Sequence, residues 1–151
     1  MSAFCIQSGV MEILCGIIGR CTRLRNNHMA IDHIKAPSLF GADMLSPAGT
    51  PPNPAGGERV QLSKRDGFVA PDGQVETGTW ESTPGQFRRA VMDAEFSHFI
   101  AGRATFLADD GQKVEFAAGD AAYFPPFTHG TWIIHETLRK TYVVWRHTVP
   151  A

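Results

Sequence analysis

The stretch between Glu95 and Arg146 constrains the fold more than any other part of the chain. It reads as a train of short segments rich in β-branched and aromatic residues, which favour strands. Turn signals separate these segments at Asp109-Asp110-Gly111, Ala118-Gly119-Asp120 and Pro125-Pro126. Glycine supplies the positive φ of a tight turn, and two prolines in a row cannot continue a strand ladder. The spacing predicts an all-β fold, either a sandwich or a barrel.

The segment that begins at Glu95 shows the clearest alternation. A period of two places Glu95, Ser97 and Phe99 on one face of the strand and the intervening residues on the other. After residue 58 no segment has the apolar repeat of an amphipathic helix. Further strands are predicted over residues 74–83, 86–91, 113–116, 121–124, 131–135 and 141–145.

The chain length of 151 residues suits one domain with a sizeable core. Residues 73–151 are predicted to form that domain, and residues 29–72 an arm in which the Pro/Gly-rich segment 46–57 is a surface loop. Residues 1–28 are interpreted as a leader outside the core, so a chain that begins at Met29 is expected to fold equally well. The apolar run within this leader is shorter than the roughly 20 residues of a transmembrane helix and contains Glu12.

The net charge limits the classes of binding partner to expect, and the cysteine content indicates the cellular compartment. The net charge is -1 and no stripe of Lys or Arg stands out, so neither a nucleic acid nor a membrane is expected as a partner. The cysteines are Cys5, Cys15 and Cys21, so no disulfide framework spans the predicted strands. That usage suits a reducing compartment, and the cytoplasm is the expected location.

Two spacings within the strand train resemble motifs of the cupin superfamily. Glu95 is followed by six residues and Gly102, and Gly119 by five residues and Pro125. The surrounding sequence is similar to that of small single-domain cupins of the ureidoglycine aminohydrolase-like branch. The similar segments are GTWESTPGQF, AEFSHFIAG, DDGQKVEFAAGDAAYFPPFTHGTW and RKTYVV. This resemblance covers about residues 73–146. It implies a double-sheet jelly-roll barrel whose mouth holds a small ligand, usually in a homodimer.

The metal site that this resemblance implies is incomplete. Metal-binding cupins take two histidines from a His-x-His motif three or four residues before the glutamate. Those positions hold Arg89 and Val91, or Arg88 and Ala90 in the alternative spacing. A first-row divalent metal needs several N or O ligands that converge on one point. The chain is therefore expected to lack a complete metal site.

The later metal-binding histidine of the family would fall at Gly130. His129 is one residue away, and its period points to the other face of the strand. If a metal such as manganese binds, Glu95 and His129 are the first candidate ligands. His129 also follows two prolines in a predicted loop, where a ligand-gating role is the alternative.

Glu95 and Lys140 are the candidate catalytic residues. Glu95 lies on the face that the resemblance turns inward. If it is buried, it is either paired, with Lys140 or an arginine, or its pKa is raised as a general acid or base requires. Lys140 belongs to the RK-x-Y word of the related cupins. It either pairs with a carboxylate, binds an anionic substrate or projects outward into solvent.

The candidate ligand-binding residues, besides His129, are Trp80, Arg89, Trp132 and Tyr142. The two tryptophans would give flat walls with an indole N–H, or would pack in the core. Arg89, if inward, would replace the charge of a metal and hold a carboxylate or phosphate. Alternation guarantees that Arg88 or Arg89 points outward. Tyr142 shares the face of Lys140 and would offer its hydroxyl, or be buried with that hydroxyl satisfied.

Three functions follow from these residues, and whether the protein is an enzyme stays open. The first is a cupin that binds a small polar metabolite, anionic or amide-bearing, without a complete metal site. The second is a metal-dependent enzyme of the ureidoglycine aminohydrolase type, against which the missing His-x-His argues. The third is a non-catalytic structural or regulatory dimer.

Overall fold

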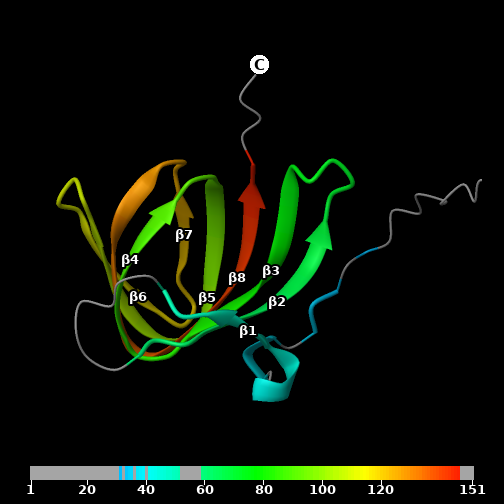
Figure 1. The fold of residues 1–151 in the computed structure, drawn as a ribbon, viewed down its shortest axis with the longest axis horizontal. Helices are drawn as coiled ribbons and strands as arrows, with labels where there is room; N and C mark the ends of the chain where they lie inside the picture. Colours follow the sequence, from blue (N-terminus) through cyan, green and yellow to red (C-terminus); the bar gives the residue numbers. More distant parts are fainter. Residues whose placement is uncertain (1–30, 32, 36, 40, 52–58, 147–151) are drawn as a thin grey trace, which may run out of the picture. The chain divides into compact units, whose positions relative to one another are not determined.

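The computed structural model describes residues 31, 33–35, 37–39, 41–51 and 59–146. The leader predicted over residues 1–28 lies outside this part. All the described elements belong to the unit Asp32–Ala151. They are, in order, two 3-10 helices and eight strands: η1 Pro37–Leu39, η2 Ala42–Met44, β1 Ser46–Gly49, β2 Leu62–Val69, β3 Val75–Ser82, β4 Gly85–Val91, β5 Ala94–Ala108, β6 Lys113–Ala117, β7 Ala121–Phe124 and β8 Thr128–Trp145 (Figure 1). In the described part, no helix has the length and apolar character to span a membrane.

Two long strands, β5 and β8, pair antiparallel and form a ribbon that two sheets share. The start of β5 and the end of β8 lie in one sheet, with β7 on one side and β3, β2 and β1 on the other. The end of β5 and the start of β8 lie in the second sheet, between β6 and β4. Figure 1 shows these strands curving around a common interior. The architecture confirms the predicted all-β jelly-roll barrel.

The ribbon changes register in the middle of β5. The pairing with β8 shifts three times between Phe99 and Ala104. Gly102 lies within this bulge with φ 83, and a Cβ at this position would lie 2.1 Å from the carbonyl oxygen of Thr137. Before the bulge the odd-numbered residues of β5 are buried, and after it Ala104 and Phe106 are buried. The bulge therefore lets both halves of β5 turn an apolar face to the interior.

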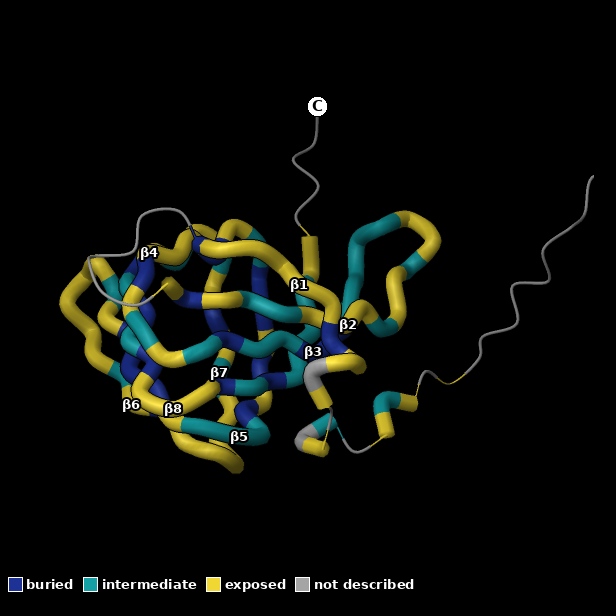
Figure 2. The backbone as a smooth tube through the Cα atoms, turned by 60° about the horizontal axis from the view of Figure 1, so that its bottom comes forward, coloured by how far each residue is buried: buried dark blue, intermediate teal, exposed yellow. Residues whose placement is uncertain are grey.

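Aromatic side chains fill the interior of the barrel. The cluster contains Phe99, Phe106, Phe116, Phe124 and Trp132. The ring centroid of Trp132 lies 4.9 to 6.1 Å from each of the other four. These separations are typical of aromatic pairs in tilted or edge-to-face contact. In Figure 2 the buried segments recur along the strands that enclose this cluster.

The strands differ from the sequence prediction at three places. The first was predicted over residues 74–83, but β1 and β2 precede β3 and belong to its sheet. Strand β1 also occupies the start of the segment 46–57 that was predicted as a loop, and its Pro47 is compatible with an edge strand. Residues 52–58 of that segment lie outside the described part. The segments 131–135 and 141–145 are one continuous strand, β8, because both pair with β5 across its bulge. The domain division at residue 73 stays a prediction.

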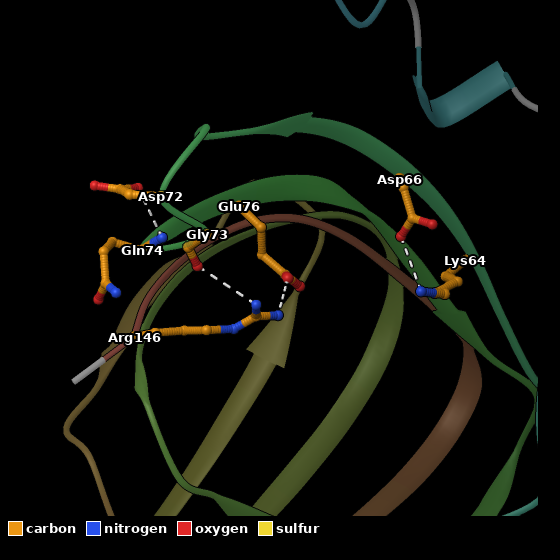
Figure 3. Close-up of polar contacts among 7 residues, drawn as sticks. All are labelled: Lys64, Asp66, Asp72, Gly73, Gln74, Glu76 and Arg146. Carbon is orange, nitrogen blue, oxygen red and sulfur yellow. Dashed lines mark hydrogen bonds and ion pairs between the residues drawn. The ribbon is translucent and has the colours of Figure 1, made fainter. Parts of the chain in front are cut away.

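The end of β8 is tied to the turn between β2 and β3 (Figure 3). The backbone N–H of Gln74 donates to Asp72 Oδ1 at 3.0 Å and shapes the turn. The backbone N–H of Arg146 donates to the carbonyl of Gln74 at 2.8 Å, and its guanidinium pairs with Glu76. These contacts hold in place the strand that carries Lys140.

Candidate functional site

An ion pair between Glu95 and Lys140 lies inside the barrel. The two residues come from β5 and β8 and are 5% and 8% exposed. Lys140 Nζ donates to Glu95 Oε1, and the Ser97 hydroxyl donates to the same oxygen at 2.6 Å. The predicted faces are confirmed, since Glu95, Ser97 and Phe99 are all buried. A buried Glu95 was expected either to be ion-paired or to have a raised pKa, and in the structure it is ion-paired.

Burial and pairing shift the pKa values of both members of this pair. Burial by itself would raise the pKa of the Glu95 carboxyl, but the charge and hydrogen bond of Lys140, helped by Ser97 and Arg89, bring that pKa below its ordinary value. Burial lowers the pKa of the Lys140 amine, against the opposing attraction of Glu95. Glu95 is therefore a carboxylate at neutral pH, and it accepts hydrogen bonds there.

Aromatic rings surround the ammonium group of Lys140. Its Nζ lies 5.3 Å from the ring centroid of Trp80 and 5.7 Å from that of Phe124. Both distances are within the range of cation–π attraction. Trp80 is the cross-strand partner of Lys140 in the β3–β8 ladder and is partly exposed. The tryptophan predicted for the ligand site thus lies beside the ion pair.

The two adjacent arginines of β4 lie on opposite faces of the strand. Arg88 projects to the outside, where its Nη1 lies 2.6 Å from Asp109 Oδ1. Arg89 shares the face of the buried Phe87, and its charge lowers the pKa of both members of the ion pair. Among the residues that the structure describes, none forms an ion pair with Arg89. Arg89 is therefore the inward arginine of the two, at an exposed position near the pair.

His129 lies on the outer face of β8, because the alternating residues Gly130 and Trp132 are buried. Its charge acts on Asp109, which is also on the outside. Glu95 and His129, the candidate metal ligands, therefore project from opposite faces of the sheet. Within the described ranges, no three side chains of His, Cys, Asp or Glu gather into a cluster that would hold a metal ion. The donors around Glu95, a single carboxylate bonded to Lys140, do not fit a divalent metal.

The other two candidates have different environments. Trp132 is 3% exposed and belongs to the aromatic core. Tyr142 is half-buried, and burial, together with nearby carboxylates, raises the pKa of its hydroxyl to about 12. This hydroxyl lies against Gly78, where an added Cβ would be only 2.6 Å from it. Tyr142 therefore keeps its hydroxyl proton at neutral pH, on the same face as Lys140.

Two members of the site were not singled out in the sequence. Ser97 shares the face of Glu95 by period two, so the alternation signal was sufficient to find it. Phe124 reaches the site because β7 pairs with the start of β5, opposite Glu95. Nothing in the local sequence of β7 indicates that pairing.

The two-sheet jelly-roll barrel agrees with the fold that the resemblance to cupins implied. Residues 69–142 match the EutQ-like cupin domain. Over this stretch, just under half of its length, the chain is similar to the EutQ-like cupin domain. The finer resemblance to the ureidoglycine aminohydrolase branch stays a prediction.

Solved structures with the same fold include EutQ from Clostridium difficile, with 18% identity, a TM-score of 0.50 and coverage of 57% of this chain and 68% of that one. A DUF861-family protein of unknown function from Pseudomonas syringae pv. tomato has 24% identity and a TM-score of 0.60 over 66% of this chain and 43% of its own. A cupin superfamily protein from Desulfitobacterium hafniense has 10% identity and a TM-score of 0.50 over 58% and 79%. These identities show the fold alone. The chain spans less than half of the Pseudomonas protein, and a comparison with curated proteins found no match.

Proposed function

We propose that the barrel interior binds a small anionic metabolite beside Arg89 and the Glu95–Lys140 pair. The observation that supports this is the charge balance of the inner face. Lys140 and Glu95 neutralise each other, whereas Arg89 has no ion-pair partner among the described residues. A carboxylate or phosphate of the ligand would supply the opposite charge, and the planar guanidinium fork suits both groups.

The remaining groups of the site suit a ligand that also carries N–H donors. Within the described part, both hydrogen bonds to the Glu95 carboxylate go to Oε1. That leaves Oε2 to accept an N–H from an amide or ureide group of the ligand. Trp80 supplies an apolar wall beside these groups. The substrate class that fits is thus a small carboxylate bearing an amide, amine or ureide.

Thermal unfolding in the presence of candidate ligands tests this proposal. At neutral pH and constant ionic strength, carboxylates of succinate size or larger and ureide carboxylates are expected to raise Tm saturably, whereas neutral sugars are not. A ligand at 100 times its Kd adds about 2.7 kcal/mol to the free energy of unfolding. Arg89→Gln is expected to remove the shift, and Arg88→Gln to retain it, because Arg88 lies on the outer face. No shift with any ligand class, or an undiminished shift in Arg89→Gln, would contradict the proposal.

The metal-dependent alternative has its own test. Protein purified without chelator is expected to contain far less than one manganese or other divalent metal ion per chain. The reason is that no three His, Cys, Asp or Glu side chains gather at one point in the described part of the chain. Elemental analysis measures this ratio directly. A value near one ion per chain would revive the aminohydrolase-type function.

Homodimer formation and a cytoplasmic location stay predictions. Every side chain of the proposed site comes from one chain. A monomer in analytical ultracentrifugation would therefore contradict the dimer without contradicting the ligand site.

A further inference from the structure

A row of side chains crosses five neighbouring strands on one sheet of the barrel (Figure 1). Tyr123 of β7 is the cross-strand partner of Phe96 of β5, and Phe96 is also the partner of Val143 of β8. Val143 in turn lies opposite Thr77 of β3. Phe68 of β2 completes the row, because its backbone N–H donates to the Thr77 hydroxyl at 2.9 Å. Neighbouring strands lie about 4.8 Å apart, so the row is about 19 Å long.

This row projects to the outside of the barrel. Glu95 and Ser97, the neighbours of Phe96 in β5, are buried in the interior, so strand alternation turns Phe96 outward. A second outward pair, Val75 of β3 and Trp145 of β8, lies next to the row. We call the apolar members of both rows the outer apolar face: Phe68, Val75, Phe96, Tyr123, Val143 and Trp145.

The aromatic residues of the outer apolar face are open to solvent. Phe96 and Trp145 are each 42% exposed. Phe68 is 44% exposed and Tyr123 is 58% exposed. An aromatic residue contributes about 150–250 Å² when it is fully buried, so these four together offer about 300–450 Å². One side of a standard protein interface covers about 800 Å², of which roughly 450–500 Å² is non-polar. The face therefore supplies most of the apolar area that one side of a stable dimer needs.

The charges of the chain favour a second copy as the partner of this face. None of the six side chains is Asp, Glu, Lys or Arg, and Arg146, which follows the face, pairs with Glu76. In a two-fold contact the same patch lies on both sides, so a charged patch would repel its own copy. The net charge of the whole chain is only -1, so two copies repel each other weakly. A partner of opposite charge would find nothing to attract it here.

The arm covers only a neighbouring part of the same side of the sheet. Thr79, two residues along β3 from the row, is 0% exposed. It lines a small cavity together with His33 and Ile34 of the arm. Arg139 anchors the arm there, since its Nη1 donates to the carbonyl oxygen of Pro37 at 3.1 Å. The described part of the arm thus buries Thr79 and leaves the outer apolar face bare beside it.

We propose that two copies of this chain associate through their outer apolar faces. The aromatic rings of one copy pack against the valines and rings of the other, in the way that two sheets pack face to face about 10 Å apart. The proposal goes beyond the expected homodimer because it assigns the surface through which the dimer forms. It is independent of the ligand proposed for the barrel interior, which lies on the opposite side of the sheet.

Sedimentation velocity of the full chain, over a range of micromolar concentrations, tests this interface. The wild type is expected to sediment as a dimer. Phe96→Glu brings two carboxylates into the buried contact and is expected to raise the dimer dissociation constant about 100-fold or more. Leu107→Glu is the matched control, because Leu107 is an exposed apolar residue of the same strand in the half that pairs with β6. This control is expected to remain dimeric.

A second variant and a second measurement make the result independent of any one substitution. Tyr123→Glu is expected to dissociate the dimer as Phe96→Glu does, and circular dichroism verifies that both variants fold. Hydroxyl-radical footprinting of the wild type is expected to show Phe96 and Trp145 protected as the concentration rises, while Leu107 keeps its reactivity. A wild type that is monomeric at every concentration, a dimer that Phe96→Glu and Tyr123→Glu both retain, or unprotected Phe96 in the dimer would each overturn the proposal.

Discussion

Replacing Lys140 with methionine is expected to lower the free energy of unfolding by about 3–5 kcal/mol at neutral pH. The substitution leaves the Glu95 carboxylate buried among aromatic rings, with the Ser97 hydroxyl as its remaining hydrogen-bond partner in the described part. An unpaired buried charge loses its hydration without an equal return. Urea unfolding of the wild type and of Lys140→Met measures the difference.

The double variant Glu95→Leu/Lys140→Met is the control for this effect. It removes both charges and fills the space with apolar side chains, which is often neutral or stabilising for a buried pair. We expect it to regain most of the stability that Lys140→Met loses. A double variant as unstable as Lys140→Met would show that the loss comes from packing around Lys140 and not from the uncompensated carboxylate.

The pH dependence of the single variant provides an independent readout. In the wild type the pKa of Glu95 is lowered in the folded state, so its contribution to stability is present above the unfolded-state pKa and is lost as the pH falls through the folded-state value. In Lys140→Met burial is expected to raise that pKa. The stability of the variant should then decrease as the pH rises from about 5 to about 7. A variant whose stability rises over this range would contradict the assignment.

The substitution Gly102→Ala is expected to destabilise the fold by about 2–4 kcal/mol or more. The φ of 83 at Gly102 is unfavourable for a residue with a side chain. The new Cβ would also lie 2.1 Å from the carbonyl oxygen of Thr137. Since this is backbone of the paired strand, the ladder itself must move. Urea unfolding, with circular dichroism as the probe, measures the loss.

Gly111→Ala is the matched control for Gly102→Ala. Gly111 has a φ of 93 in the turn between β5 and β6, but no atom lies within 4 Å of the position of its Cβ. Its substitution is expected to cost only the strain of the positive φ, about 1–2 kcal/mol. The excess in Gly102→Ala then measures the steric conflict at the bulge. Equal losses in the two variants would mean that the bulge tolerates a side chain.

The local patterns of the chain predicted most of the strands and the face of each residue. The alternation at Glu95 placed Ser97 and Phe99 beside it correctly, because the side-chain period of a strand depends only on its backbone. The same rule required the side chains of Arg88 and Arg89 to lie on opposite faces of their strand. The pattern missed β1 and β2, where proline, glycine and charged residues hide the strand signal. These two strands owe their stability to pairing with β3, which is a non-local interaction.

By itself the strand pattern determined an all-β fold, either a sandwich or a barrel, and the resemblance to cupins implied the barrel with Glu95 on its inner face. Only the tertiary structure decided which charges meet there. Lys140 is 45 positions away in the sequence, and it reaches Glu95 because of the register between β5 and β8. Likewise, the charge of Arg89 acts on the ion pair because β4 joins β8 in one register. Such meetings depend on the pairing of distant strands, and the local side-chain pattern of a strand carries no information about its partner.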